Sequence, residues 1–78
     1  MVMETKFDSI ADIANLQRMA STVDEQVLIA SQDDSIRVDA RSFLGLFTLD
    51  FSQPVKVITD SVYVLRRLET ASRARARV

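Results

Sequence analysis

The sequence predicts an α+β fold in which a mostly antiparallel sheet carries helices on one face. Short runs alternate apolar with polar residues, as strands do, and longer segments repeat their apolar residues at helical spacing. These patterns follow one another in the order β-α-β-β-α-β-α along the 78 residues. A hairpin in the middle of that order makes neighbouring strands antiparallel, and helices gathered on one face bury their apolar stripes economically.

The first strand and the first helix are predicted near the N-terminus. Residues 2–7 carry a weak period-two alternation, which indicates a strand. Asp8 or Ser9 can then cap a helix. The apolar residues of that helix recur at helical spacing from Ile10 to Ala20, and the polar residues that follow break the pattern.

The hairpin is predicted from two short runs on either side of a polar turn. Val27–Ala30 is rich in branched apolar residues, and Ile36–Asp39 alternates apolar with polar side chains. Gln32–Ser35 has the composition of a turn. The alternation in the second run indicates that this arm is half buried.

A short helix is predicted from Phe43 to Leu49, with Ser42 in or beside its cap. Pro54 prevents the helix from continuing. Gly45 in its middle costs about 1 kcal/mol relative to alanine. Either the close approach of a partner's backbone or a tolerated surface position accounts for this glycine.

The last strand and the last helix close the domain. Val55–Thr59 alternates like a strand, and Asp60 or Ser61 can cap the helix that follows. The apolar stripe of that helix consists of Val64, Leu65 and Leu68.

The arginine-rich end is predicted to be a frayed tail, so that residues 1–73 form the domain and residues 74–78 a basic tail. Met1–Val64 holds ten acidic and five basic residues, whereas Leu65–Val78 holds five arginines and one glutamate. The basic end suits a phosphate or an acidic partner, or else a solvated helix terminus that the helix dipole favours. Its arginines form no compact motif, so we do not expect nucleic acid as the partner.

The chain contains no histidine and no cysteine. This absence removes imidazole and thiol chemistry, and we expect no enzymatic activity, no cofactor and no metal site. Asp33 and Asp34 are too few ligands for Ca²⁺, so turn chemistry explains them. The lack of cysteine suits a reducing cytoplasm, and no apolar run approaches the ~20 residues of a membrane span. We expect a cytoplasmic protein that has no signal peptide and makes no membrane contact.

The segment Asp39–Leu49 followed by Ser52–Val55 resembles the HPr family, the small phosphocarriers of the bacterial sugar phosphotransferase system. Ala40–Ser42 stands at the family's Ala-Lys-Ser, and Ser52–Pro54 stands at its Thr-Gln-Gly-like turn. The match is clear over about residues 26–60, and the N-terminal third matches only in pattern. The resemblance implies the family's open-faced sandwich, whose element order is the one derived above.

The same resemblance predicts that the phosphocarrier reaction is absent. The family's active site is a histidine followed closely by arginine and proline, in a loop that contains glycine. That histidine falls near Ser9, which Ile10 and Ala11 follow, and no arginine, proline or glycine stands beside them. A phosphoserine ester is not labile enough to pass its phosphoryl group on. The closer analogy is a small HPr-like protein of Gram-positive bacteria that lacks the histidine, keeps the serine and acts only in regulation.

Ser42 matches the serine that HPr kinase phosphorylates in Gram-positive bacteria, so it is the candidate phospho-acceptor. A dianion at a helix N-terminus meets free N–H groups, and Arg41 can pair with it. A plain helix cap is the other reading of Ser42.

The short helix is also the predicted binding surface. Phe43, Leu44 and Phe47 share one side, and Leu46 and Leu49 share another. The family pattern directs the first group outward, where HPr docks its partners, and the second group into the core. The other reading is that the helix lies against the C-terminal segment or a second copy of the chain, so that all five residues are buried. We therefore expect a regulatory protein-binding module that uses Arg41 and the outward group, or a structural domain that forms a homodimer through this helix.

Overall fold

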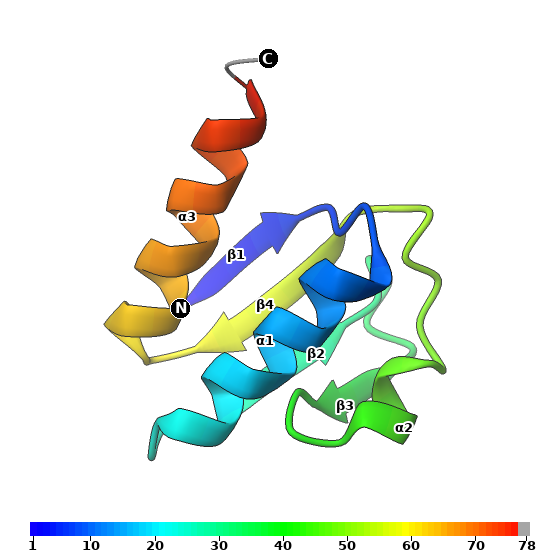
Figure 1. Cartoon of the computed structure of the whole chain (residues 1–78). Helices are drawn as coiled ribbons and strands as arrows, with labels where there is room; N and C mark the ends of the chain where they lie inside the picture. The colour runs from blue at the N-terminus through cyan, green and yellow to red at the C-terminus, as the bar shows by residue number, and fades with distance from the viewer. Residues whose placement is uncertain (77–78) are drawn as a thin grey trace.

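Four strands form a single antiparallel sheet in the computed structural model, in the order β1-β4-β2-β3 (Figure 1). The structure describes the backbone of residues 1–76 and the side chains of residues 1–71. The strands are β1 (Val2–Thr5), β2 (Val27–Ala30), β3 (Arg37–Asp39) and β4 (Val55–Thr59). The helices are α1 (Ile10–Thr22), α2 (Phe43–Leu46) and α3 (Val62–Ala76). The predicted α+β class and element order are confirmed.

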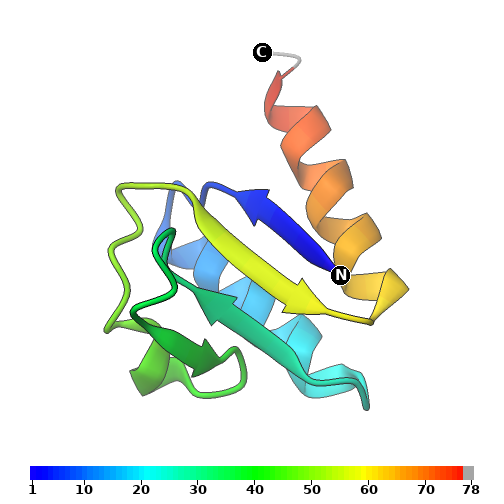
Figure 2. The same ribbon diagram turned by 180° about the vertical axis from the view of Figure 1, so that it is seen from behind.

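The core lies between the helices and one face of the sheet. Alternate residues of β4 (Val55, Val57 and Thr59) are buried, and the residues between them are partly exposed. This is the pattern of a strand that is covered on one side only. Figure 2 shows the uncovered side, with β4 and β2 in front of α1. The least exposed large side chains of the core are Leu16, Ile29, Leu46, Val27, Val55, Val57 and Val64.

The first strand is shorter than the alternation of residues 2–7 predicts. β1 ends at Thr5, and the chain then turns Phe7 into the core, where only 5% of it is exposed. Its ring meets Phe51 edge to face, with 5.8 Å between the centroids and 85° between the planes. Phe7 keeps the core-facing side that the alternation predicts, although the ladder with β4 ends at Thr5 opposite Val55.

The first helix is longer than predicted and ends at Thr22 rather than at Ala20. The hydroxyl of Ser21 donates to the carbonyl of Gln17 at 2.9 Å, and that of Thr22 donates to the carbonyl of Met19 at 2.8 Å. Both polar residues therefore satisfy their hydroxyls within the helix instead of breaking it.

The second helix is shorter than the predicted Phe43–Leu49. Beyond Leu46 the backbone tightens, because the N–H of Thr48 donates to Gly45 O at 3.1 Å and the N–H of Leu49 donates to Leu46 O at 3.2 Å. Hydrogen bonds that span three residues are typical of a 3₁₀ turn. The segment still delivers Leu49 to the core.

The last helix begins after Ser61, whose buried hydroxyl accepts a hydrogen bond from the N–H of Val64 at 3.3 Å. Of the predicted stripe, Val64 and Leu68 are buried, whereas Leu65 is only partly buried. The helix continues past the boundary expected at residue 73 as far as Ala76, and residues 77–78 of the predicted tail lie outside the described residues. No helix in the part of the chain that the structure describes combines the length and apolarity of a membrane span.

Candidate functional site around helix α2

The turn that leads into α2 is held by the carboxylate of Asp39 at the end of β3. Asp39 Oδ1 accepts a hydrogen bond from the backbone N–H of Arg41 at 2.9 Å, and Asp39 Oδ2 lies 3.4 Å from Nη2 of the Arg41 guanidinium. The backbone N–H and then the guanidinium lower the pKa of Asp39. From α1, Gln17 Nε2 donates to the carbonyl of Arg41 at 3.3 Å, so the turn is tied to two elements.

Ser42 is the N-cap of α2. Its Oγ accepts a hydrogen bond from the N–H of Gly45 at 3.2 Å, and its own N–H donates to Asp39 O at 3.0 Å. Ser42 is exposed, so its hydroxyl faces solvent while it caps the helix. The capping role that the sequence predicts is confirmed, and the role of phospho-acceptor stays a prediction.

Gly45 is required by close approach within the chain. A Cβ at this position would stand 3.1 Å from Ser42 Oγ and 3.4 Å from the Cβ of Val38 in β3. The position is half-buried and not open surface, and the close approach of a partner's backbone stays a prediction. The missing side chain lets α2 lie against β3 and leaves room around the Ser42 hydroxyl.

The two sides of the α2 segment separate as the sequence predicts. Leu46 is fully buried and Leu49 is 7% exposed, whereas Leu44 is 86% exposed and Phe47 is 57% exposed. The rings of Phe43 and Phe47 stack with 5.3 Å between their centroids and 28° between their planes. We name Phe43, Leu44 and Phe47 the α2 patch. Phe43 and Phe47 lie one turn apart, so their rings stack on each other at the surface.

Ser9, at the position near the family's histidine, is the N-cap of α1. Its Oγ accepts a hydrogen bond from the N–H of Asp12 at 3.2 Å. The carboxylate of Asp12 accepts from the N–H of Asp8 at 3.2 Å, and Asp8 lies 3.6 Å from the ammonium of Lys6. Two carboxylates beside this hydroxyl repel an incoming phosphate, so the surroundings do not favour phosphoryl transfer.

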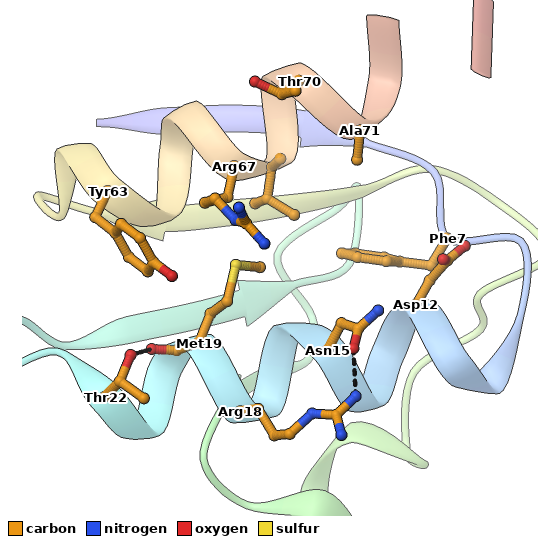
Figure 3. A pocket seen from close by; sticks show the side chains of 11 residues that line it. Phe7, Asp12, Asn15, Arg18, Met19, Thr22, Tyr63, Arg67, Thr70 and Ala71 are labelled. Atoms are coloured by element: carbon orange, nitrogen blue, oxygen red, sulfur yellow. Dashed lines mark hydrogen bonds between the residues drawn. The ribbon is translucent and has the colours of Figure 1, made fainter. Parts of the chain in front are cut away.

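The sequence does not predict the groove between α1 and α3, because the residues that line it come from helices far apart in the chain. It holds about 530 Å³, and none of the predicted site residues lines it. Figure 3 shows Tyr63 and Arg67 reaching into it from α3 and Met19 reaching up from α1. Arg18 donates to Asn15 Oδ1 at its rim. Asp12 and Arg67 give the groove charges of both signs, so its electrostatics select no class of ligand.

The acidic turn after β2 is built by hydrogen bonds and ion pairs. Asp33 Oδ1 accepts from the hydroxyl of Ser35 at 2.7 Å, and with the N–H of Ser35 and the hydroxyl of Ser31 this lowers the pKa of Asp33 to about 2. Asp34 lies 2.7 Å from Lys56 Nζ. The prediction of turn chemistry is confirmed, and no cluster of potential metal ligands occurs among the residues that the structure describes.

Comparisons with known proteins identify no relative of this chain. No protein-family model, no curated protein and no solved structure matches the chain. The α2 patch and the Ser42 turn are therefore interpreted from their own geometry.

Proposed function

We propose that this chain is a regulatory protein-binding module of HPr-like design, which docks a protein partner through the α2 patch and does not carry phosphoryl groups on histidine. The observation that carries the proposal is the exposure of Leu44 and Phe47 on a segment whose other side is buried. An apolar group that stays at the surface while its neighbours fill the core is typical of an interaction site.

Three further observations support the HPr-like part of the proposal. The element order agrees with that of the family. The serine of the Ala-Arg-Ser segment caps the short second helix. The position near the family's histidine holds Ser9, which caps α1 between carboxylates.

We propose Ser42 as the site that switches this docking. Its hydroxyl is exposed, it precedes the α2 patch directly, and the absence of a side chain at Gly45 leaves space beside Oγ. A phosphate there would add about two negative charges next to Phe43, which disfavours docking of an apolar or acidic partner surface. The resemblance implies HPr kinase as the modifying enzyme and the cytoplasm as the compartment.

The test uses HPr kinase with ATP, followed by intact mass. We expect wild type to gain one phosphate and Ser42→Ala to gain none. Phe47→Asp should lower kcat/KM for phosphorylation while Ser42 remains in place, because the kinase would dock on the α2 patch. Val62→Asp is the matched control, since Val62 is an apolar residue on α3 with a similar exposed fraction of 52%. Equal rates for wild type and Phe47→Asp, or no phosphate on wild type, would contradict this proposal.

Two parallel measurements test the remaining parts. Incubation with the first enzyme of the phosphotransferase system and phosphoenolpyruvate should leave the chain unmodified. Sedimentation of wild type and Phe47→Asp should show monomers in both cases. A dimer that Phe47→Asp dissociates would instead assign the α2 patch to a second copy of the chain, as the alternative homodimer hypothesis requires.

A further inference from the structure

The free edge of β1 offers backbone groups that have no partner within the described residues. The N–H of Thr59 donates to Met1 O at 3.0 Å, and the register pairs Met3 with Val57. Because bonded and non-bonded pairs alternate along an antiparallel ladder, Met1, Met3 and Thr5 direct their backbone groups toward β4. Val2 and Glu4 therefore direct theirs away from the sheet, and no described residue accepts from or donates to them there.

A shallow apolar groove runs beside this edge. It holds about 340 Å³ and lies between residues 1–3 and the α3 side chains Val62, Leu65, Arg66 and Glu69. Val2 is 62% exposed and Val62 is 52% exposed. The groove thus places apolar side chains next to the unpaired backbone groups.

Helix α3 overhangs the position where a fifth strand would lie. It starts beside β1, and its second half extends past the edge of the sheet, as both Figure 1 and Figure 2 show. Among the α3 residues whose side chains the structure describes, Val64 and Leu68 reach the core, and both lie in the first half of the helix. A strand added to β1 would lie in the plane of the sheet beneath this overhang.

Two of the devices that usually block strand addition are absent from this edge. β1 has no proline, and its ladder with β4 runs without a bulge from Val2 to Thr5. Its single charge is Glu4, which makes no ion pair with any residue that the structure describes. The cross-strand neighbour of Glu4 is Lys56, whose ammonium lies 2.7 Å from Asp34 instead.

We propose that the free edge of β1 binds an extended segment of a partner protein as a fifth, antiparallel strand. The residue opposite Glu4 would be basic, to complement the unpaired carboxylate. The residue opposite Met3 would be apolar and enter the groove beneath α3, since Met3 lies on the helix side of the sheet. The residue opposite Val2 would be apolar and lie on the uncovered face. Read from its N-terminus, the segment is basic-apolar-apolar.

A second copy of β1 fits this edge poorly. Within β1 only Val2 and Glu4 present backbone groups outward, so a two-fold pairing sets Glu4 against Glu4, sets Glu4 against Val2, or sets Val2 against Val2 and leaves Glu4 outside the pairing. Like charges directly opposite each other destabilise a sheet, and a valine leaves the carboxylate without a partner. The charge pattern therefore favours a different chain as the occupant.

The test uses a capped synthetic peptide of sequence TRVVT, titrated against labelled protein while amide chemical shifts are followed. We expect saturable shifts at Val2, Glu4 and Leu65. Methylation of the backbone nitrogen of the arginine, or of the second valine, should weaken binding about fivefold, because each change removes one strand hydrogen bond. Methylation of the first valine is the matched control, because that N–H points away from β1.

Variants of the protein test the same contacts from the other side. Val2→Pro removes an N–H that β4 does not use, so it should weaken peptide binding without unfolding the sheet. Glu4→Lys should weaken binding of TRVVT and favour TEVVT, and Asp24→Lys is its charge control. Phe47→Asp should leave peptide binding unchanged, which separates this edge from the α2 patch. Absence of saturable shifts, equal effects of all three methylations, or a dimer that Val2→Pro dissociates would overturn the proposal.

Discussion

The hydroxyl of Ser42 and the backbone of Gly45 are in direct contact, because Oγ accepts the Gly45 N–H at 3.2 Å and a Cβ on residue 45 would stand 3.1 Å from the same oxygen. The cap and the glycine therefore depend on each other. A Cβ at position 45 would require the Ser42 hydroxyl to shift by a few tenths of an ångström, whereas the Val38 Cβ at 3.4 Å would be in ordinary contact with it.

A double-mutant cycle should detect this dependence. We expect Ser42→Ala to cost about 1 kcal/mol through the lost cap. Gly45→Ala should give no gain in wild type, because its Cβ crowds the Ser42 hydroxyl. In the Ser42→Ala background the same change should raise the unfolding free energy by up to about 1 kcal/mol, because alanine has a higher helix propensity than glycine. Urea unfolding of the four proteins measures the coupling, and strictly additive effects would contradict it.

Leu44 and Leu46 should respond oppositely to truncation, although they lie two residues apart. Leu46→Ala empties a fully buried position and should cost about 2–5 kcal/mol of unfolding free energy. Leu44→Ala, at 86% exposure, should stay within about 0.5 kcal/mol of wild type. Thermal unfolding compares the two variants. A large loss for Leu44→Ala would mean that the α2 patch is part of the core.

Acid pH should reveal how much the hydrogen bonds of the turn after β2 stabilise the fold. The folded-state pKa of Asp33 is lowered from 3.8 to about 2, so its hydrogen bonds stabilise the fold above pH 3.8. That contribution is lost as the pH falls through about 2, where Asp33 becomes protonated in the folded state. Carboxyl chemical shifts followed across this range should give the low midpoint.

Ser35→Ala should raise the pKa of Asp33 toward its ordinary value, since the Ser35 hydroxyl is its strongest partner. Ser52→Ala serves as the control, because the Ser52 hydroxyl lowers the pKa of Asp50 and does not contact Asp33. An unchanged Asp33 midpoint in Ser35→Ala would assign the shift to another cause.

The same turn holds Asp34 in a left-handed conformation, with φ of 61°. Asn adopts this region at least as readily as Asp, whereas Ala does not. Asp34→Asn should therefore lose only the ion pairs with Lys56 and Arg37, each of which contributes about 0–1 kcal/mol and weakens in salt. Asp34→Ala should cost about 1 kcal/mol more. Urea unfolding at low and high salt measures both effects, and equal losses for the two variants would argue against backbone strain.

The sequence could predict what depends on local spacing. The burial of Leu46 and Leu49 and the exposure of Leu44 follow from helical periodicity together with the resemblance to a family whose short helix faces the same way. The capping residues Ser9 and Ser42 follow from their position before an apolar run.

The remaining features depend on contacts between residues that are distant in the sequence. β1 ends at Thr5 because its partner β4 begins at Val55, and Phe7 meets Phe51 beyond that ladder. Gly45 lies over Val38 of β3, and no local pattern shows which strand packs under α2. Likewise, the edge position of β1 becomes visible only once β4 is known to insert between β1 and β2.

The strand order places the two proposed binding surfaces at opposite ends of one small domain. β1 forms one edge of the sheet, and β3, against which α2 packs, forms the other. Three inter-strand spacings separate these edges, about 14 Å from backbone to backbone. The two proposed surfaces share no residue, so one chain could hold an occupant at each. A domain with both proposed sites would act as a connector: removing either contact would release one partner and leave the other attached.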